Sequence, residues 1–357
     1  MIWSLFLSYQ TVTAQSGPDY RRLDTLVGQI LDDSLTPGIS LVVFDDQQIL
    51  HQVHQGVRNL KTQNPVGPKT VFEAASLSKT VFAYLYLLEK ERAGLALDDQ
   101  VDQLPDLPAL AADQRFAEVT PALLLSHQSG LPNWRGRFDR TGATYPTQFK
   151  ATDTLQLKQA PGSGFSYSGE GYLYLQRVLE GRTKEDLEEL ARRRLFSPLN
   201  MTRSSYIPQT RLESLIAEGY YRDGNSRPAL AAKLPVSAAS LLTTSRDYAA
   251  FLQELLRRED MLREMGTPLV PVDTLDGTLI SWGLGLGITE YQGNRYVFHW
   301  GDNGPFKAYF MLSLSEKKGV VWMANSQDGL SFRDGLIRAV FRQDIPMWPT
   351  DYTQRLE

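Results

Sequence analysis

The chain has 357 residues, 42% of them hydrophobic and 22% charged, which is enough to bury a large globular core. Its formal net charge of −4 gives no electrostatic basis for binding nucleic acid or an anionic membrane surface. Cysteine is absent and the four histidines lack the spacing of a metal motif, which argues against a disulfide, a thiol nucleophile and a metal site. We therefore expect no cofactor and no nucleic-acid partner.

Residues 1–16 open with an apolar run that is too short to span a membrane, so no stable membrane insertion is expected. Val12-Thr13-Ala14 resembles the small-residue cleavage site of a secretory signal, although no Lys or Arg precedes Arg21. This pattern favours an exported protein, periplasmic or extracellular. The alternative is a disordered N-terminus on a cytoplasmic protein.

The next elements are a helix and a hairpin. Apolar residues at helical spacing predict an amphipathic helix over 20–33. The runs 39–44 and 48–53 flank a short polar turn and predict two paired strands. His51 and His54 lie three apart in the second run, so we expect them on opposite faces of that strand.

The segment 72–94 predicts a helix with no polar face, because residues 81–88 are all apolar. Such a helix has to be surrounded by protein, and Gly94 predicts its end. Ser76 and Lys79 stand three apart at its start and therefore share one face of the first turn. A second Ser-x-x-Lys match, at 315–318, lies in a predicted hairpin turn and indicates no site.

The middle of the chain predicts short helices and loops. Thr120-Pro121 predicts a capped helix as far as Leu125. Further helices are expected near 172–180, over 184–195 after a Thr183 cap, and over 246–257.

After Trp282 the pattern returns to strands, followed by a closing helix over 332–341. We expect an α+β fold whose antiparallel sheet has about five strands, two from the N-terminal hairpin and three from a C-terminal meander. Terminal helices should cover one face, with a mainly helical subdomain inserted. The predicted division is a sheet part at 19–75 and 270–345, a helical part at 76–269, and a tail at 346–357. The Ser76 helix would lie where the two parts meet, and pockets often form at such boundaries.

This layout resembles the serine β-lactamase/penicillin-binding-protein superfamily. The resemblance is strongest to the branch with class C β-lactamases, D-alanyl-D-alanine carboxypeptidases, D-aminopeptidases and β-lactamase-like esterases. It extends from about residue 19 to 342 and implies a β-lactamase/transpeptidase-like fold. Five short stretches carry it in the family's order: FEAASLSK (72–79), LLLSHQSGLP (123–132), FSYSGEGY (165–172), LFSPLNMT (195–202) and FHWG (298–301).

The resemblance implies a role for each matching position. Ser76 matches the nucleophile and Lys79 the lysine that activates it. Tyr167 matches the tyrosine of the second motif, Tyr-x-Asn, which shuttles protons. His299 begins the third motif, here His-Trp-Gly where relatives have Lys-Thr-Gly or His-x-Gly. The chemistry agrees, because a serine hydroxyl becomes a good nucleophile only when a neighbouring base takes its proton.

Two further matches concern substrate binding. The residue after Gly301, Asp302, would supply one oxyanion-hole N–H and Ser76 the other, as the family's arrangement implies. The second motif departs from the family pattern because Gly169 stands where the asparagine is expected. The missing asparagine bears on the recognition of amides and β-lactams more than on the activity of the nucleophile. Glu170 follows and is explained as a residue of a helix's first turn.

We therefore expect a serine hydrolase that forms an acyl-enzyme on Ser76, with an ester or a D-amino-acid or peptide-like amide as substrate. An esterase or D-peptidase is favoured over an efficient β-lactamase. The alternative is a catalytically weak relative that binds a peptide or cell-wall ligand. A Ser-His-Asp hydrolase is disfavoured because the chain has no Gly-x-Ser-x-Gly. The sequence does not indicate an oligomeric state.

The same residues also have plainer interpretations. Ser76 could cap its helix beside a solvated lysine, Tyr167 could be an ordinary buried tyrosine, and His299 could be an ordinary strand residue. We interpret His127 as structural, supporting the loop at Ser129-Gly130. Aromatic residues of the loop-rich part are candidates for the cleft wall or for the core: Trp134, Tyr145 and Phe149.

Overall fold

The computed structural model describes residues 20–104, 107, 110, 112–134, 154–229 and 232–348. The predicted export signal at 1–16, the tail beyond 348, and Tyr145 and Phe149 lie outside these residues. Within the described ranges, no helix is both long enough and apolar enough to cross a membrane.

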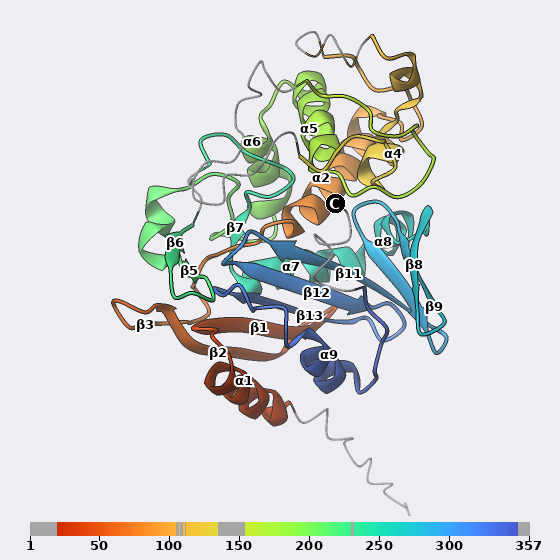
Figure 1. Ribbon diagram of the computed structural model, residues 1–357. Coiled ribbons are helices and arrows are strands. Elements are labelled where there is room, and N and C mark those ends of the chain that lie inside the picture. The colour runs from red at the N-terminus through yellow and green to blue at the C-terminus, as the bar shows by residue number, and fades with distance from the viewer. Residues whose placement is uncertain are drawn as a thin grey trace, which may run out of the picture.

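The fold is built on one large antiparallel sheet (Figure 1). In the described part of the chain it has nine strands, in the spatial order β3-β2-β1-β13-β12-β11-β10-β9-β8. In the same order they are Asn64–Pro65, Ile49–Asn59, Gly38–Asp45, Lys318–Ala324, Lys307–Ser313, Asn294–Asp302, Gly287–Tyr291, Thr278–Trp282 and Val270–Leu275. Two small sheets pair β4 (Phe72–Glu73) with β7 (Leu242–Thr243) and β5 (Glu218–Tyr220) with β6 (Ser226–Pro228).

The predicted α+β class is confirmed, but the predicted number of about five strands is wrong. Strands β8 and β9 form a hairpin that the sequence pattern hid. Pro271 lies within β8, and proline usually argues against a strand unless that strand is at an edge, where β8 is found. Asp276 and Gly277 form the turn with positive φ values of 49° and 75°, as a tight hairpin turn requires.

The sheet is covered on both faces (Figure 1). The terminal helices α1 (Arg21–Asp33) and α9 (Arg333–Phe341) pack on one face, as predicted, and α7 (Ser245–Arg257) packs on the other. Helix α7 thus belongs to the sheet layer although its residues fall within the stretch expected to form the helical part. Burial on both faces explains why β1 reads as a continuous apolar run.

The two histidines of β2 face opposite sides, as their spacing predicted. His51 Nε2 lies 3.1 Å from Asp24 on α1. His54 Nδ1 lies 2.8 Å from the hydroxyl of Ser40, which in turn lies 2.6 Å from that of Ser245 on α7. Neither histidine is near the start of the predicted Ser76 helix.

The other helices form the second part of the molecule or link it to the sheet. One prediction here is wrong, because Thr183 ends a helix instead of capping the next one. Lys184 adopts a left-handed φ of 60°, and Asp186 then caps the following helix with a 2.8 Å bond from Glu189 N. These helices are α4 (Pro121–Leu125), α5 (Gly169–Thr183), α6 (Leu187–Ala191) and α8 (Glu259–Met265), with short 3₁₀ or π turns at Gln114–Glu118, Arg192–Phe196 and Thr210–Leu215.

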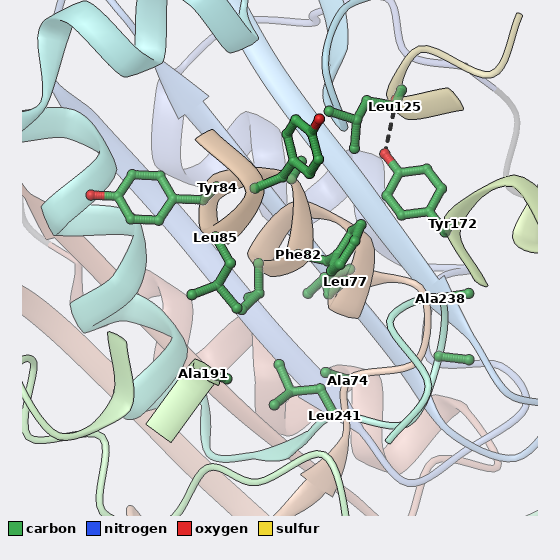
Figure 2. Packing of buried hydrophobic residues seen from close by; sticks show 14 of the residues in the cluster. Ala74, Leu77, Phe82, Tyr84, Leu85, Leu125, Tyr172, Ala191, Ala238 and Leu241 are labelled. Atoms are coloured by element: carbon green, nitrogen blue, oxygen red, sulfur yellow. Dashed lines mark hydrogen bonds between the residues drawn. The ribbon is translucent and has the colours of Figure 1, made fainter. Parts of the chain in front are cut away.

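Helix α2 (Leu77–Ala93) lies between the sheet and these helices, as its apolar sequence requires (Figure 1). Its residues from Leu77 to Leu87 are all buried, whereas 91–93 in its last turn are exposed. Figure 2 shows Phe82 and Leu85 among residues from several elements. Beside them, the Tyr172 hydroxyl donates to Leu125 O at 2.8 Å, which joins α5 to α4 (Figure 2). Gly94 ends the helix with φ 66°, as predicted.

Candidate active site

The site is built around the first turn of α2. Between Val71 and Leu87, Ser76 is the one residue that is not fully buried. It occupies the N-cap position, but its side chain makes no capping bond, so the helix-cap interpretation does not hold. Ala75, just before it, has a φ of 50°. A non-glycine residue in this left-handed region is strained, and such strain is concentrated at functional sites.

Lys79 lies behind Ser76 and is completely buried. Its Nζ donates to Ser76 Oγ at 3.1 Å and to Ala238 O at 2.7 Å. Burial lowers the pKa of this amine to about 7, because an ammonium loses its hydration in the protein interior. The interpretation as a solvated lysine is therefore wrong. No sequence pattern indicated Ala238, since a backbone carbonyl acceptor can belong to any residue type.

Aromatic rings surround the Lys79 amine. Its Nζ lies 4.8 Å from the centre of the Tyr167 ring, 5.7 Å from that of Tyr172 and 5.9 Å from that of Trp134. Among the described residues, no carboxylate forms an ion pair with this amine. With no anion to favour the ammonium, a substantial neutral fraction is expected near neutral pH.

Tyr167 is buried beside Ser76 and Lys79. Burial raises the pKa of its phenol. His127 holds the segment in place: its Nδ1 accepts from Ser168 N at 2.9 Å, and its carbonyl accepts from Ser166 N at 2.7 Å. Its ring centre lies 4.2 Å from that of Tyr167. His127 thus has a structural role, and the segment that it holds is 166–168.

His299 is fully buried on β11. It pairs with Phe310 across the ladder and therefore lies on the sheet face that packs against α2. Its Nδ1 lies 2.7 Å from Trp300 O, which fixes the proton on Nδ1 and leaves Nε2 as the acceptor. Burial, together with the charge of Lys79, lowers the pKa of His299 to about 3. Its ring centre is 6.2 Å from that of Tyr167.

The end of β11 lies against the loop that precedes Ser76. A Cβ built on Gly301 would lie 2.3 Å from Ala74 O, so only glycine allows this approach. Asn303 N donates to Phe306 O, so residues 303 and 301 are those that make the ladder hydrogen bonds to β12. The N–H of Asp302, which lies between them, therefore points away from that strand. This N–H makes no ladder hydrogen bond to β12, and it follows directly on the glycine that lies against Ala74.

Behind this strand end lies a buried polar network that the sequence did not predict. Glu73, only 2% exposed, forms an ion pair with Arg227 at 2.8 Å. Asn303 Nδ2 donates to Glu73 Oε2 at 2.6 Å, and Arg227 Nη2 donates to Asn303 O at 2.7 Å. Asp302, next in the chain, pairs with Lys307. These contacts fix the turn that follows the third motif.

Replacing Gly301 by alanine should disrupt the site. The added methyl would meet the Ala74 carbonyl, so one backbone must move, at a cost of about 1–3 kcal/mol of unfolding free energy. We expect turnover of any good substrate to fall by about 10²-fold, since small displacements of catalytic groups have such effects. Thermal melts and steady-state kinetics would measure both.

The control is Gly335→Ala on α9. A Cβ there would meet nothing within 4 Å, and alanine is the better helix former. This variant should keep its activity and its stability. Equal behaviour of the two variants would contradict the close approach of β11 to the Ala74 loop.

The departure at Gly169 has a structural counterpart. A Cβ on Gly169 would lie 2.7 Å from Trp134 Cζ2 and 2.8 Å from Asn133 O. An asparagine could not simply be restored at this position, because the tryptophan ring and the Asn133 carbonyl fill the space. Of the predicted cleft residues, Trp134 is therefore at the site, and it is partly exposed there. Glu170 is buried in the first turn of α5.

Comparisons with known proteins agree on one family. The sequence profile of the family described as "Beta-lactamase" matches residues 23–344. The chain is 27% identical over 351 residues to a D-aminopeptidase of Gluconobacter oxydans (strain 621H), covering 94% of this chain and 64% of that protein. It is 28% identical over 222 residues to Esterase EstB of Burkholderia gladioli, covering 58% of this chain and 56% of the esterase.

A solved class C beta-lactamase has the same fold, with a TM-score of 0.76, 20% sequence identity, and coverage of 92% of this chain and 99% of that one. This confirms the fold expected from the resemblance. The chain spans less than two thirds of the length of the two curated relatives named above.

Proposed function

Since the chain belongs to the beta-lactamase family, we propose that it is a serine hydrolase that acts through an acyl-enzyme on Ser76. The observation that carries this proposal is the 3.1 Å contact between Lys79 Nζ and Ser76 Oγ, made by a buried amine whose pKa is lowered to about 7. A hydroxyl in contact with a base that is partly neutral at physiological pH is an activated nucleophile.

In acylation, neutral Lys79 takes the proton of Ser76 as Oγ bonds to the substrate's carbonyl carbon. The backbone N–H groups of Ser76 and Asp302 would stabilise the resulting oxyanion, at about 2–4 kcal/mol for each donor. Tyr167, whose ring centre lies 4.8 Å from Lys79 Nζ, would pass the proton to the leaving oxygen or nitrogen as its bond to carbon breaks. Neutral His299 supplies an acceptor, Nε2, near this tyrosine. Water then attacks the acyl-enzyme and returns the proton to Ser76.

The substrate that we propose is a small ester or a D-amino-acid or peptide-like amide. The names of the relatives, an esterase and a D-aminopeptidase, support both classes. Esters are favoured, because Gly169 offers no carboxamide to hold a substrate amide, and an ester needs less help at its leaving group. A catalytically weak protein that binds a peptide or cell-wall ligand remains the second candidate, as the absent asparagine would also suit it.

A labelled fluorophosphonate separates the two candidates. Covalent labelling of the wild-type protein that is lost in Ser76→Ala supports the hydrolase, and a folded wild-type protein that resists labelling supports the binding protein. A parallel screen of p-nitrophenyl esters, D-amino-acid amides and a chromogenic cephalosporin would identify the substrate class. Hydrolysis of the cephalosporin as fast as of the esters would overturn the preference for esters.

Chelators should leave the activity unchanged. None of the described residues forms a cluster of three His, Cys, Asp or Glu side chains that could hold a metal ion, and the proposed chemistry uses an amine as its base. Assays before and after dialysis against EDTA would measure this. Activity lost with EDTA and restored by zinc would refute the proposal of a metal-free mechanism.

We further propose that the protein is exported, on the basis of the small residues Val12-Thr13-Ala14. Mass spectrometry of the protein recovered from the periplasm or medium would test this. A chain found only in the cytoplasm with its first residues intact would contradict it.

A further inference from the structure

Trp134 and Gly169 are sterically matched. The Cβ of any residue at 169 would lie 2.7 Å from Trp134 Cζ2 and 2.8 Å from Cη2, closer than real Cβ atoms approach a neighbour. The six-membered part of the indole therefore lies directly on the glycine backbone. Either a side chain at 169 or this position of the ring can exist, but not both.

The loop before the ring is tied firmly to α5. The N–H groups of Gly169 and Glu170 both donate to Asn133 O, each at 3.0 Å. Gly169 N also lies 3.1 Å from Asn133 Oδ1, and Ser168 Oγ donates to Pro132 O at 2.9 Å. Because these bonds reach the residue just before the tryptophan, the ring is held at the site by the helix start itself.

The ring also borders the reacting groups. Its centre lies 5.9 Å from Lys79 Nζ, and the residue is only partly buried. An indole can donate one hydrogen bond and accepts none in the plane of the ring. A substrate N–H placed against its face would exchange its hydrogen bond to water for a much weaker contact with the π face of the ring.

We propose that Trp134 is a specificity-determining residue that selects acyl groups with a hydrocarbon chain over acyl groups that carry an amide next to the reacting carbonyl. This rests on the proposed acyl-enzyme chemistry at Ser76. Gly169 is the partner that makes room for the ring. The substrates that fit best are then aliphatic or arylalkyl esters, and acylamino compounds fit poorly.

A pair of esters isolates this effect. The p-nitrophenyl esters of N-benzoylglycine and of 4-oxo-4-phenylbutanoic acid differ only in one NH that is replaced by CH₂. The wild-type enzyme should favour the CH₂ ester over the NH ester, in the ratio of their kcat/KM values, about 10-fold more than a variant without the indole does, the size of one unmade hydrogen bond.

Two variants then test the tryptophan. Trp134→Ala should lower the ratio of the two kcat/KM values about 10-fold, because water can reach the substrate NH. Trp134→Phe keeps an apolar ring and should keep the wild-type ratio. A ratio that stays the same in Trp134→Ala would overturn the inference.

A measurement without turnover separates this inference from the proposed function. Calorimetric binding of the two free acids to the Ser76→Ala protein should show the same preference, and Trp134→Ala in that background should remove it. Absence of ester hydrolysis by the wild type would contradict the proposed function alone. Equal binding of the two acids with and without Trp134 would contradict the role of the tryptophan, whether or not the protein is an enzyme.

Discussion

Replacing Ser76 by alanine should abolish turnover while leaving the fold intact. Its Oγ is the atom that would carry the acyl group, and loss of a serine nucleophile typically lowers kcat by about 10⁴-fold or more. The side chain is partly exposed and makes no capping bond, so its removal opens no core cavity and leaves no helix uncapped. Thermal unfolding of the variant should therefore match that of the wild type within about 1 kcal/mol.

Intact-mass spectrometry with a slowly hydrolysed ester should find one acyl group on the wild-type protein and none on Ser76→Ala. The chain offers a matched control, since Ser315 begins the second Ser-x-x-Lys match, in the turn between β12 and β13. Ser315→Ala should retain both the adduct and the activity. An adduct mapped to any residue other than Ser76 would refute the assignment of Ser76 as the nucleophile.

Much of this arrangement could be predicted because it depends on local patterns. Residues 81–88 are apolar on every side of the helix, so α2 had to be buried. Gly94 predicted a helix end through its left-handed backbone, and Thr120 predicted a helix start through its capping side chain. Ser76 and Lys79 share a face of one helical turn, so their contact follows from their spacing alone. Only the family resemblance led us to expect that His299 and Tyr167 would both approach α2.

Other features depend on contacts between distant segments, which leave no local pattern. Ala238 binds Lys79 through its carbonyl, so its side chain carries no signal. Trp134 resembled any aromatic residue of a loop, and only its contact with Gly169 distinguishes it. Edge strand β8 was hidden by Pro271, because proline is tolerated where one side of a strand has no partner.

The rate of acylation should rise with pH through an apparent pKa near 7. Lys79 can accept the proton of Ser76 only in its neutral form, and burial lowers its pKa to about 7. The value of kcat/KM should therefore be low at pH 5 and level off above about pH 8. Lys79→Arg should lose about 10³-fold at every pH, since a guanidinium does not deprotonate in this range. A wild-type profile that is flat from pH 5 to 9 would exclude Lys79 as the base.

The burial of Lys79 should also make the free energy of unfolding depend on pH, which can be measured without a substrate. Between pH 7 and 10 the unfolded chain still binds the Lys79 proton, while the folded protein has released it. The free energy of unfolding should therefore increase with pH in this range, by up to about 1.4 kcal/mol for each pH unit, relative to that of Lys79→Met. Below pH 6 the difference should be constant, because both states are protonated. Urea unfolding of both proteins from pH 5 to 10, with the exposed-site variant Lys61→Met alongside, would measure it. If the wild type gains nothing over Lys79→Met between pH 7 and 10, the buried amine keeps its proton in the folded protein and cannot activate Ser76 at neutral pH.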